Sequence, residues 1–479
     1  MTAPTMPWKK AGVMGLGLSG IAAAGFLARH GVKVVAADSK TLDHLGDEAA
    51  ALGKLGVDLR AGAVDARAFA GCEVVIASPG VPPSVPPMAA AAAAGTPIMA
   101  EIELASRFAR GVILGITGTN GKSTVTALTG AILKAGGLTS WVCGNIGTPF
   151  STVVEADLPL PDAEARKVHY VVELSSFQLE GIVTFKPQVA VLLNVSPDHQ
   201  DRYTKVQDYY AAKARIFMNQ SGDDVAVVNW DDAASHPIAE RLASRLFPFS
   251  LTQDLEEGAV LQGDRLVLRR DGRDELILGA GKVPIPGRHN LENVLAAAAT
   301  AWHCGISADV IGRAVRGFSG LPHRLELVMA VSGVSYYNDS KATNVGATQR
   351  ALEAFTAPVV LLLGGYDKGG EFEQLRGPLS GVRGGPGAQA RPGRVRTVVT
   401  FGKAGDDIAR RVEGAGPPVV RSGSLADAVK AASGVAHPGD IVLLAPGCAS
   451  FDAYTGYDKR GEDFRAIVKR LATQTGGQG

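Results

Sequence analysis

A loop that can bind phosphate is the clearest chemical feature of the sequence. Residues 113–124 read ILGITGTNGKST, an apolar run followed by a glycine-bracketed turn and the predicted start of a helix. Backbone N–H groups in such a turn form, with the helix N-terminus, a cradle for an anion. Lys122 would add a positive charge, and Ser123 or Thr124 a hydroxyl near a magnesium ion. Ile116 stands where the common G-x-x-x-x-G-K-[ST] motif has its first glycine, so we predict a nucleotide-phosphate site of a variant type.

Two further polar groups follow predicted strands of the same region. Glu173 ends a buried strand, where a carboxylate is costly unless it is paired or bound to a metal. We therefore predict a magnesium ligand, with a capping or ion-pair role as the alternative. His199 follows the next strand, with Asp198 or Asp201 as its orienting partner. Because ligands gather at the carboxyl ends of strands in open α/β sheets, His199 is predicted to bind metal or substrate, with a solvated loop as the alternative.

A second glycine motif lies near the N-terminus. Gly15, Gly17 and Gly20 follow a predicted strand in the G-x-G-x-x-G spacing, and Asp38 ends the next strand. Such a turn can hold the diphosphate of a dinucleotide, with the acidic residue on the ribose. A UDP-sugar also carries a diphosphate and a ribose, so the same turn could bind it. A purely structural glycine turn is a further alternative. These residues alone leave the ligand open.

The elements that position these groups alternate β-branched strands with Ala- and Leu-rich helices, which predicts parallel α/β sheets. Three blocks are expected, at 1–109, 110–320 and 321–479, with a hinge at 317–322. Residues 380–396 are rich in Gly, Pro and Arg and are predicted to form a flexible surface insertion. Strands are predicted at 32–37, 74–77, 168–173, 189–195, 224–229, 358–363, 397–401, 418–420 and 440–445, short β segments within 250–285, and helices at 89–94, 206–219 and 290–304.

Composition favours an enzyme of a reducing compartment. The chain has 479 residues, of which 46% are hydrophobic, enough for about three domains. A formal net charge of +1 argues against a nucleic acid partner. Its four scattered cysteines lack the spacing of a disulfide or zinc framework. Glycines interrupt the apolar stretch at 11–28, so we predict no signal peptide, no membrane insertion and a cytoplasmic monomer.

Several longer motifs together resemble the Mur ligase family of peptidoglycan synthesis. They are TGTNGKST (117–124), ELSSFQLE (173–180), DHQDRY (198–203), GRHNLEN (287–293) and LPHR (321–324). Three more resemble the MurD type within that family: NDSKATN (338–344), LLGG (362–365) and PGCASFD (446–452). The resemblance implies a Rossmann-like N-terminal domain for a UDP substrate, a central P-loop ATPase-like domain and a Rossmann-like C-terminal domain for D-glutamate.

The resemblance also implies the contacts of each substrate. UDP-N-acetylmuramoyl-L-alanine would be bound by Leu18, Ser19, Asp38, Ser39, Lys40, Ser78, Gly80, Asn145, Ser175 and Gln178. ATP would be bound by Gly118, Thr119, Asn120, Gly121, Lys122, Ser123, Thr124, Asn290, Arg324 and Asp339. D-Glutamate would be bound by Lys341, Thr343, Lys368, Ser450 and Phe451. Lysines suit that position, since the incoming amino acid carries two carboxylates.

For catalysis, the resemblance implies two steps. The L-alanyl carboxylate attacks the γ-phosphate of ATP to give an acyl phosphate, and the amine of D-glutamate then displaces phosphate to form an amide. Lys122, Glu173, His199 and Lys213 would be catalytic, and two magnesium ions would be held by Ser123, Thr124, Glu173, His199 and Lys213. By pattern alone Lys213 is an ordinary surface lysine. The family lysine at this position is carbamylated, which makes it an oxygen ligand and requires a neutral amine.

Three other functions are weighed against this one. A nicotinamide dehydrogenase would use residues 15–20 but leave the phosphate loop unexplained. A ligase like folylpolyglutamate synthase would share the middle domain but not the UDP-type first domain. A non-catalytic nucleotide-binding regulator would need neither Glu173 nor Lys213. Two residues depart from the family pattern: Gln200, where methionine is frequent, and Tyr457, where a phenylalanine commonly packs beside the D-glutamate site.

Overall fold

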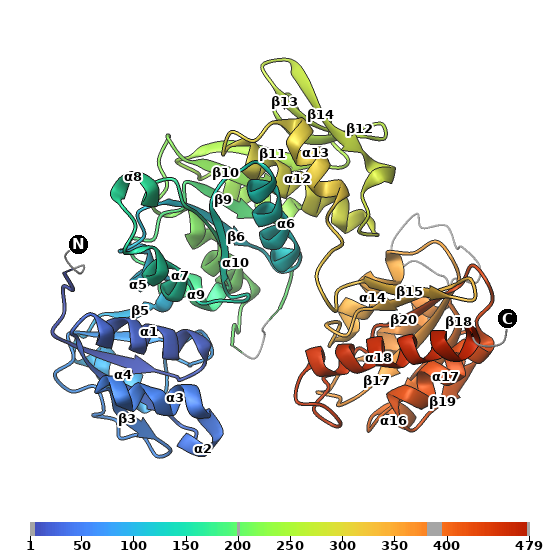
Figure 1. Cartoon of the computed structure of the whole chain (residues 1–479), viewed down its shortest axis with the longest axis horizontal. Coiled ribbons are helices and arrows are strands. Elements are labelled where there is room, and N and C mark those ends of the chain that lie inside the picture. The colour runs from blue at the N-terminus through green and yellow to red at the C-terminus, as the bar shows by residue number, and fades with distance from the viewer. Residues whose placement is uncertain (1–4, 199–201, 381–394, 477–479) are drawn as a thin grey trace. The chain divides into compact units, whose positions relative to one another are not determined.

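The computed structural model of the chain describes residues 5–198, 202–380 and 395–476. The chain divides into two compact units, whose elements are labelled in Figure 1. The first unit comprises Met1–Val283 and Leu291–Phe318, and the second comprises Pro284–Asn290 and Ser319–Gly479. Two β-sheets belong to the first unit and one to the second. Each sheet is formed within one of the three predicted blocks, and the bounds of those blocks stay a prediction.

The first sheet is parallel, with the strand order β3-β2-β1-β4-β5. Apolar runs form its central strands β1, β2 and β4 and are buried on both faces, as in other parallel sheets, whereas the edge strand β3 is partly exposed. The order reverses beside β1, so a crevice is expected at the carboxyl end of that strand. The strands are β1 (Lys10–Met14), β2 (Lys33–Asp38), β3 (Asp58–Ala61), β4 (Val74–Ala77) and β5 (Ile98–Ala100); the helices are α1 (Leu18–Arg29), α2 (Leu42–Leu45), α3 (Asp47–Ala51), α4 (Pro86–Ala93) and α5 (Glu101–Ser106).

The second sheet has the order β14-β13-β12-β11-β10-β9-β6-β8-β7. Strand β6 lies between β8 and β9 and is parallel to both, and β7 is parallel to β8, so the loops after these strands leave one edge of the sheet. The strands are β6 (Val112–Thr117), β7 (Ser140–Gly144), β8 (His169–Glu173), β9 (Val189–Leu192), β10 (Val225–Asn229), β11 (Arg245–Ser250), β12 (Gly258–Gln262), β13 (Arg265–Arg270) and β14 (Arg273–Gly279). The helices are α6 (Lys122–Ala135), α7 (Phe150–Asp157), α8 (Asp162–Ala165), α9 (Ser176–Glu180), α10 (Val206–Ala214), α11 (His236–Ala239), α12 (Arg288–Trp302) and α13 (Ala308–Arg316).

The third sheet has the order β15-β16-β20-β17-β18-β19, with an apolar core on each face. Strand β20 is parallel to its neighbours β16 and β17, so the loops after these three strands emerge side by side. The strands are β15 (Glu326–Val331), β16 (Val334–Asn338), β17 (Val359–Gly364), β18 (Val395–Phe401), β19 (Val419–Arg421) and β20 (Ile441–Leu444). The helices are α14 (Val345–Glu353), α15 (Arg376–Leu379), α16 (Gly405–Val412), α17 (Leu425–Val435) and α18 (Tyr457–Gly476).

The predicted parallel sheets are confirmed, and antiparallel pairs extend two of them at one edge. Strands β12, β13 and β14 pair antiparallel, and so do β15 and β16. Two-residue turns join them, at 263–264, 271–272 and 332–333, and Asp271 and Ser332 have positive φ. Such turns match the twist of a hairpin, and the Asp-Gly pair at 271–272 was a signal for one.

Two other predictions need correction. The short strand β7 was not predicted, because its residues SWVCG include only one β-branched side chain. The predicted insertion at 380–396 is too long at its end, since strand β18 already begins at Val395. Residues 381–394 lie outside the described part of the chain.

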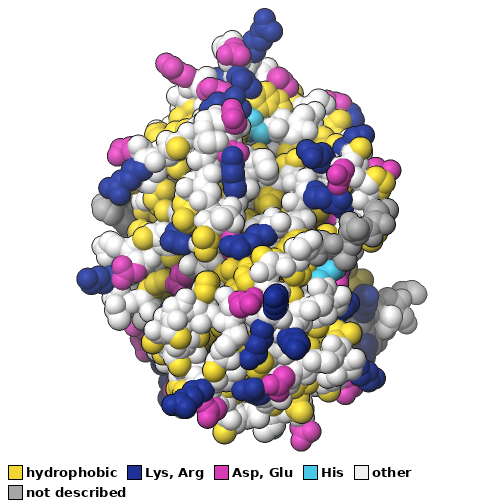
Figure 2. Space-filling model, turned by 90° about the vertical axis from the view of Figure 1, so that its left-hand side faces the viewer, with side chains coloured by type: hydrophobic (Ala, Val, Ile, Leu, Met, Phe, Trp, Pro, Cys, Tyr) yellow, Lys and Arg dark blue, Asp and Glu magenta, His cyan; other side chains and the backbone are white. Residues whose placement is uncertain are grey.

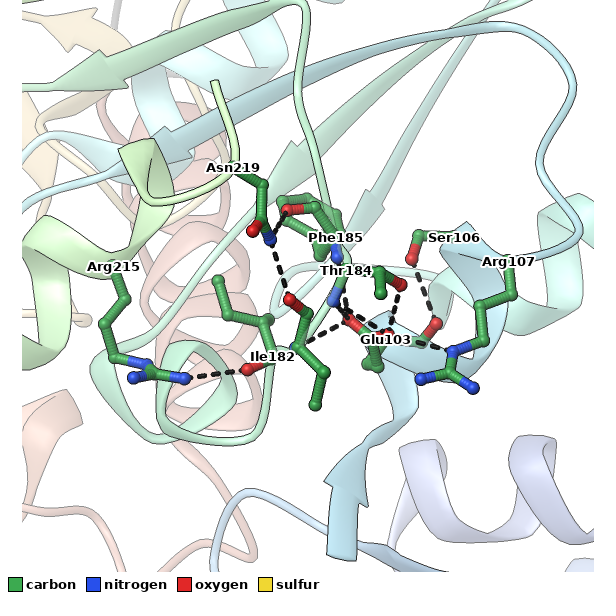
Figure 3. A network of polar contacts seen from close by, with 9 residues as sticks. Glu103, Ser106, Arg107, Ile182, Thr184, Phe185, Arg215 and Asn219 are labelled. Carbon is green, nitrogen blue, oxygen red and sulfur yellow. Dashed lines mark hydrogen bonds and ion pairs between the residues drawn. The ribbon is translucent and has the colours of Figure 1, made fainter. Parts of the chain in front are cut away.

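Glu103 joins helix α5 to a turn that follows helix α9 (Figure 3). Its carboxylate accepts hydrogen bonds from the backbone N–H groups of Val183 (2.9 Å), Thr184 (3.0 Å) and Phe185 (2.8 Å). The Thr184 hydroxyl and Arg107 Nε donate to the same carboxylate, at 2.6 and 2.9 Å. The Glu103 side chain is fully buried. Through these hydrogen bonds, the buried carboxylate fixes helix α5 to the turn between helix α9 and strand β9.

We expect Glu103→Gln to lower the free energy of unfolding by about 3 kcal/mol, because it removes the charge that these donors and Arg107 surround. Burial alone would raise the pKa of Glu103, but hydrogen bonds from Thr184, Val183 and Arg107 lower it. The stabilisation is therefore present above the unfolded pKa of about 4.3 and is lost as the pH falls through the lower folded value. Urea denaturation at several pH values measures this difference. The exposed Glu164→Gln is the control, and equal stability of the two variants would contradict the assignment.

The surface carries charges of both signs. Figure 2 shows Lys and Arg side chains interspersed with Asp and Glu over the face in view, as expected for a net charge of +1. Among the helices of the described residues, none is both long and apolar enough to cross a membrane.

Candidate functional site

The phosphate loop joins strand β6 to helix α6, which begins at Lys122 without a side-chain cap. Asn194, after strand β9, holds the loop: its carbonyl accepts from Thr119 N–H and its Oδ1 from Asn120 N–H, both at 2.9 Å. Lys122 Nζ donates to the carbonyls of Gly118 (2.8 Å) and Thr119 (3.0 Å), which folds its ammonium over the turn. A helix N-terminus and an ammonium thus meet in one loop, and both attract phosphate.

The loop's departure from the common motif has a structural reason. Ile116 is fully buried within β6, so the strand continues through the position of the missing glycine. The turn depends on Gly118, with a φ of +155°, and on the second glycine of the motif, Gly121, with a φ of +86°. A Cβ there would lie 2.4 Å from Asn293 Oδ1, so a larger residue would collide with helix α12. Ser123 and Thr124 follow in the first turn of α6, and both are buried.

Glu173 is the last residue of strand β8, beside Ile116 of β6 and Gly144 of β7. It is only 2% exposed. Its Oε1 accepts a hydrogen bond of 2.9 Å from Asn145 Nδ2, whose backbone N–H also donates to the Glu173 carbonyl. Glu173 Oε2 is buried and has no hydrogen-bond partner among the described residues. Since a buried carboxylate oxygen needs a partner, this atom is suited to receive a cation.

Lys213, on helix α10, is 1% exposed, so its interpretation as a surface lysine is wrong. Its Nζ donates to the Gly118 carbonyl at 2.8 Å. Burial, and next the cation of Lys122, lower the pKa of Lys213 to about 6, against the opposing effects of Asp198 and Glu173. Its amine is therefore largely neutral near pH 7, which is the form that reacts with carbon dioxide.

Ser175 and Gln178 form a capping box at the start of helix α9. Ser175 N–H donates to Gln178 Oε1 (2.9 Å), and Gln178 N–H donates to Ser175 Oγ (3.2 Å). Gln178 Nε2 is buried without a partner among the described residues, so it can donate to a ligand. His199, Gln200 and Asp201 lie outside the described residues, and the role of His199 stays a prediction.

A cavity of about 600 Å³ lies at the carboxyl edge of the first sheet, beside the N-terminus of helix α1. Its size is within the range of about 300–1,000 Å³ that is typical of small-molecule sites. Val64, Val81 and Val85 contribute apolar walls. The structure brings together here all the N-terminal residues predicted for the UDP substrate: Leu18, Ser19, Asp38, Ser39, Lys40, Ser78 and Gly80.

Asp38 and Ser78 organise the turns around this cavity. Asp38 accepts hydrogen bonds from Leu16 N–H (2.7 Å) and from Lys40 N–H (2.8 Å), one on each carboxylate oxygen. Ser78 Oγ donates to the carbonyl of Gly15 at 2.7 Å. These bonds tie the glycine turn to the loops after β2 and β4. The start of helix α1 therefore faces a preformed space, which is a suitable position for a diphosphate.

The residues predicted for D-glutamate lie on the adjacent loops after β16, β17 and β20. Lys341 Nζ lies 5.0 Å from the centre of the Tyr457 ring, and Lys368 Nζ lies 5.2 Å from that of Phe451. Phe451 is 62% exposed, whereas its neighbour Ser450 is buried. Two ammonium groups at one edge of the third sheet suit a ligand with two carboxylates.

Asp339 and Arg324, predicted near ATP, belong to the second unit. Asp339 Oδ1 accepts a hydrogen bond of 3.3 Å from Leu325 N–H. Burial raises the pKa of Asp339 to about 6, although Arg324 opposes that shift. Asn290, at the start of helix α12, donates to the Pro286 carbonyl at 2.6 Å. Asn290, Arg324 and Asp339 thus all belong to the second unit.

Two residues that sequence reasoning missed shape these sites. Asn194 holds the phosphate loop, and its position directly after a predicted strand was an available signal. Arg460 lies in the first turn of helix α18 and is fully buried. By its sequence context it resembles an exposed helical arginine, so only the fold reveals it.

Three family models match the chain in order. Residues 9–100 match the Mur ligase MurD-like N-terminal domain, residues 116–301 the Mur ligase middle domain, and residues 323–448 the Mur ligase glutamate ligase domain. Together these matches extend over most of the sequence and over all three sheets.

Solved structures share the architecture at low sequence identity. The UDP-N-acetylmuramate-alanine ligase MurC from Thermotoga maritima aligns with a TM-score of 0.57 at 17% identity, covering 98% of this chain and 100% of that one. The MurF ligase from Thermotoga maritima, solved in complex with ADP, aligns with a TM-score of 0.57 at 16% identity, covering 92% and 96%. At this identity the likeness concerns the fold.

Curated relatives are more similar in sequence. The UDP-N-acetylmuramoylalanine--D-glutamate ligase of Acidobacterium capsulatum is 42% identical over 463 residues, which covers 96% of each chain. The protein of the same name from Geobacter metallireducens is 42% identical over 461 residues, covering 96% of this chain and 97% of that one. With the family models, these relatives show that the chain belongs to the Mur ligase family, in its MurD type.

Proposed function

We propose that this protein is an ATP-dependent ligase that joins D-glutamate to UDP-N-acetylmuramoyl-L-alanine in the cytoplasmic synthesis of peptidoglycan precursors. One observation carries the proposal: a phosphate loop with Lys122, the buried lysine Lys213 and the buried carboxylate of Glu173 share one edge of the second sheet. The activity in the names of relatives that match 96% of the chain supports it. A dehydrogenase would leave this edge without a role.

The UDP substrate would bind at the cavity of the first sheet. The start of helix α1, with Leu18 and Ser19, would receive the diphosphate, and Lys40 would add a positive charge. Asn145, Ser175 and Gln178 would contact the muramoyl-alanine part. The unpartnered donor of Gln178 supports that assignment.

The first chemical step brings two anions together. The alanyl carboxylate attacks the γ-phosphorus of ATP, an acyl phosphate forms, and the bond to ADP breaks. Residues 118–124 would hold the ATP phosphates through backbone N–H groups, and the Lys122 ammonium would lie where negative charge develops. Asn290, Arg324 and Asp339 would contribute the remaining nucleotide contacts.

The residues on this edge fit magnesium. Glu173 Oε2 is a buried oxygen without a partner among the described residues, and Ser123 and Thr124 offer hydroxyls. Carbon dioxide would add to the neutral amine of Lys213, with loss of a proton, and give two carbamate oxygens as further ligands. His199 would complete the set for two ions. Bound there, magnesium supplies positive charge that lowers the repulsion between carboxylate and phosphate.

The second step forms the amide. The neutral amine of D-glutamate attacks the acyl carbon, and phosphate leaves with the bonding electron pair. Lys341 and Lys368 would bind the two carboxylates of D-glutamate, with Thr343, Ser450 and Phe451 completing the site. Held in this way, the amino acid presents its amine for attack in a fixed orientation.

A panel of amino acids tests the proposed function. Phosphate release is measured with ATP, UDP-N-acetylmuramoyl-L-alanine and each amino acid in turn. We expect release to depend strictly on D-glutamate, with no acceleration by L-glutamate or D-alanine. Equal activity with other amino acids, or reduction of a nicotinamide cofactor instead, would contradict the proposal.

Lys213→Ala is expected to lose activity and to regain part of it with a short carboxylic acid such as acetate. The added carboxylate would occupy the space of the carbamate and supply the missing oxygens. Turnover is measured with increasing acetate, at matched ionic strength. The control is Lys205→Ala, because Lys205 is exposed at the start of the same helix. Absence of rescue in a folded Lys213→Ala protein would count against the carbamate.

A further inference from the structure

Arg460 is a buried cation beneath the loops of the third sheet. Its side chain is 0% exposed although it lies in the first turn of helix α18. The guanidinium donates to Ser340 Oγ (2.9 Å) and to the carbonyls of Ser340 (2.8 Å), Cys448 (3.0 Å), Ala449 (3.1 Å) and Gly364 (3.5 Å). All of its donor groups are therefore directed at the backbone and one hydroxyl.

These acceptors belong to three different loops. Ser340 follows strand β16, Gly364 ends strand β17, and Cys448 and Ala449 follow strand β20. The three strands are neighbours in the sheet. The same loops carry the proposed D-glutamate residues, namely Lys341, Thr343, Lys368, Ser450 and Phe451. One side chain thus joins every loop of that proposed site.

The loops are packed closely around the guanidinium. Gly365 has a φ of +126°, and a Cβ there would lie 2.9 Å from Arg460 NH1 and 2.4 Å from the Ala449 carbonyl oxygen. The backbones of Tyr366 and Ala449 also exchange hydrogen bonds of 2.9 and 3.0 Å. A shift of the guanidinium would therefore move both loops.

The charge of Arg460 is not neutralised by a directly bonded carboxylate. Among the described residues, each of its five hydrogen-bond acceptors is a neutral carbonyl or hydroxyl oxygen. Burial lowers the pKa of Arg460 to about 10, which leaves the group protonated near neutral pH. A buried ion usually lies against an opposite charge, because its desolvation is otherwise costly. The carboxylate of Asp452 opposes this fall in pKa through space, without a direct hydrogen bond, and a ligand with two negative charges would add to its effect from the other side of the loops.

We propose that Arg460 is the positioning residue of the acceptor amino-acid site: it sets the three loops in register and adds positive potential for a dicarboxylate. The inference rests on the proposed function, since it takes these loops to bind D-glutamate. Arg460 acts through Lys341, Lys368 and Ser450 and touches no substrate itself. It should therefore influence the amide-forming step and leave the formation of acyl phosphate unchanged.

Two variants separate charge from geometry. Arg460→Gln removes the charge, while Arg460→Lys keeps the charge but loses the planar set of donors. The control is Arg470→Gln, an exposed arginine farther along the same helix. For each protein we would measure the KM values for D-glutamate, ATP and the UDP substrate. Acyl phosphate formed without D-glutamate would be trapped with hydroxylamine as a hydroxamate.

We expect Arg460→Gln to raise the KM for D-glutamate about tenfold or more, and Arg460→Lys to raise it less. The KM for the UDP substrate, and the trapping rate at saturating ATP, should stay close to those of Arg470→Gln, and the KM for ATP should rise less than that for D-glutamate, because Asp339 adjoins Ser340. A D-glutamate KM within about twofold of the control would overturn the inference, as would an equal rise in all three KM values. An Arg460→Lys protein that fails to fold would also overturn it, by assigning Arg460 to stability. If the unchanged protein shows no dependence on D-glutamate, the proposed function fails instead.

Discussion

Lys122→Ala is expected to abolish ATP-dependent ligation and to leave the fold intact. The Lys122 ammonium lies over the phosphate loop, bonded to the carbonyls of Gly118 and Thr119, where the γ-phosphate would bear its developing charge. Removing such a preorganised charge typically costs a few kcal/mol of barrier, which is about a hundredfold or more in rate. Phosphate release under saturating substrates measures the loss.

Two comparisons make the Lys122 result specific. Lys134→Ala, in the exposed last turn of the same helix, should retain normal turnover. Lys122→Ala should also unfold at a temperature close to that of the unchanged protein, because the lysine side chain is only partly buried and its bonds are to carbonyls of its own loop. Near-normal turnover of purified Lys122→Ala would overturn its assignment to the γ-phosphate.

Glu173→Ala is expected to remove activity to a similar extent, by about a hundredfold or more. The carboxylate is buried at the end of strand β8, with one oxygen bonded to Asn145 and the other without a partner among the described residues. A group retained at a cost to stability is expected to have a role in the reaction. The melting temperature of Glu173→Ala should therefore be equal to or higher than that of the unchanged protein.

Turnover and thermal unfolding of the same preparation test this pair of expectations. The exposed Glu240→Ala provides the control for loss of a carboxylate. Loss of activity that accompanies a strongly lowered melting temperature would assign Glu173 to folding. Retained activity would show that the magnesium site lies elsewhere.

Residues at strand ends were largely predictable from the sequence. The apolar run before Lys122 and the one before Glu173 identify β6 and β8 directly, and parallel strands bring their carboxyl ends together. The seven residues of the N-terminal cavity follow from the glycine turn and from the motif resemblance. The resemblance, rather than pattern alone, supplied the nature of the substrates.

Burial was harder to predict, because it depends on packing between distant segments. Lys213 has the context of a surface helix, but in the fold its amine lies against the carbonyl of Gly118, far away in sequence, and against the Tyr209 ring. Arg460 is similar, since its acceptors are as many as 120 residues away. Short β segments were predicted within 250–285, but their antiparallel pairing was not, because the α/β pattern around them outweighed the local turn signal.

In the proposed reaction a carboxylate, and not water, attacks the γ-phosphate of ATP. Oxygen-18 in the alanyl carboxylate of the UDP substrate tests it most directly. The ligation is run with ATP and D-glutamate in unlabelled water, and the released phosphate is examined by mass spectrometry. We expect one labelled oxygen in each phosphate, because the bridging oxygen of the acyl phosphate comes from the carboxylate and leaves with phosphate when the amine attacks the acyl carbon. Phosphate that carries no label would contradict the account.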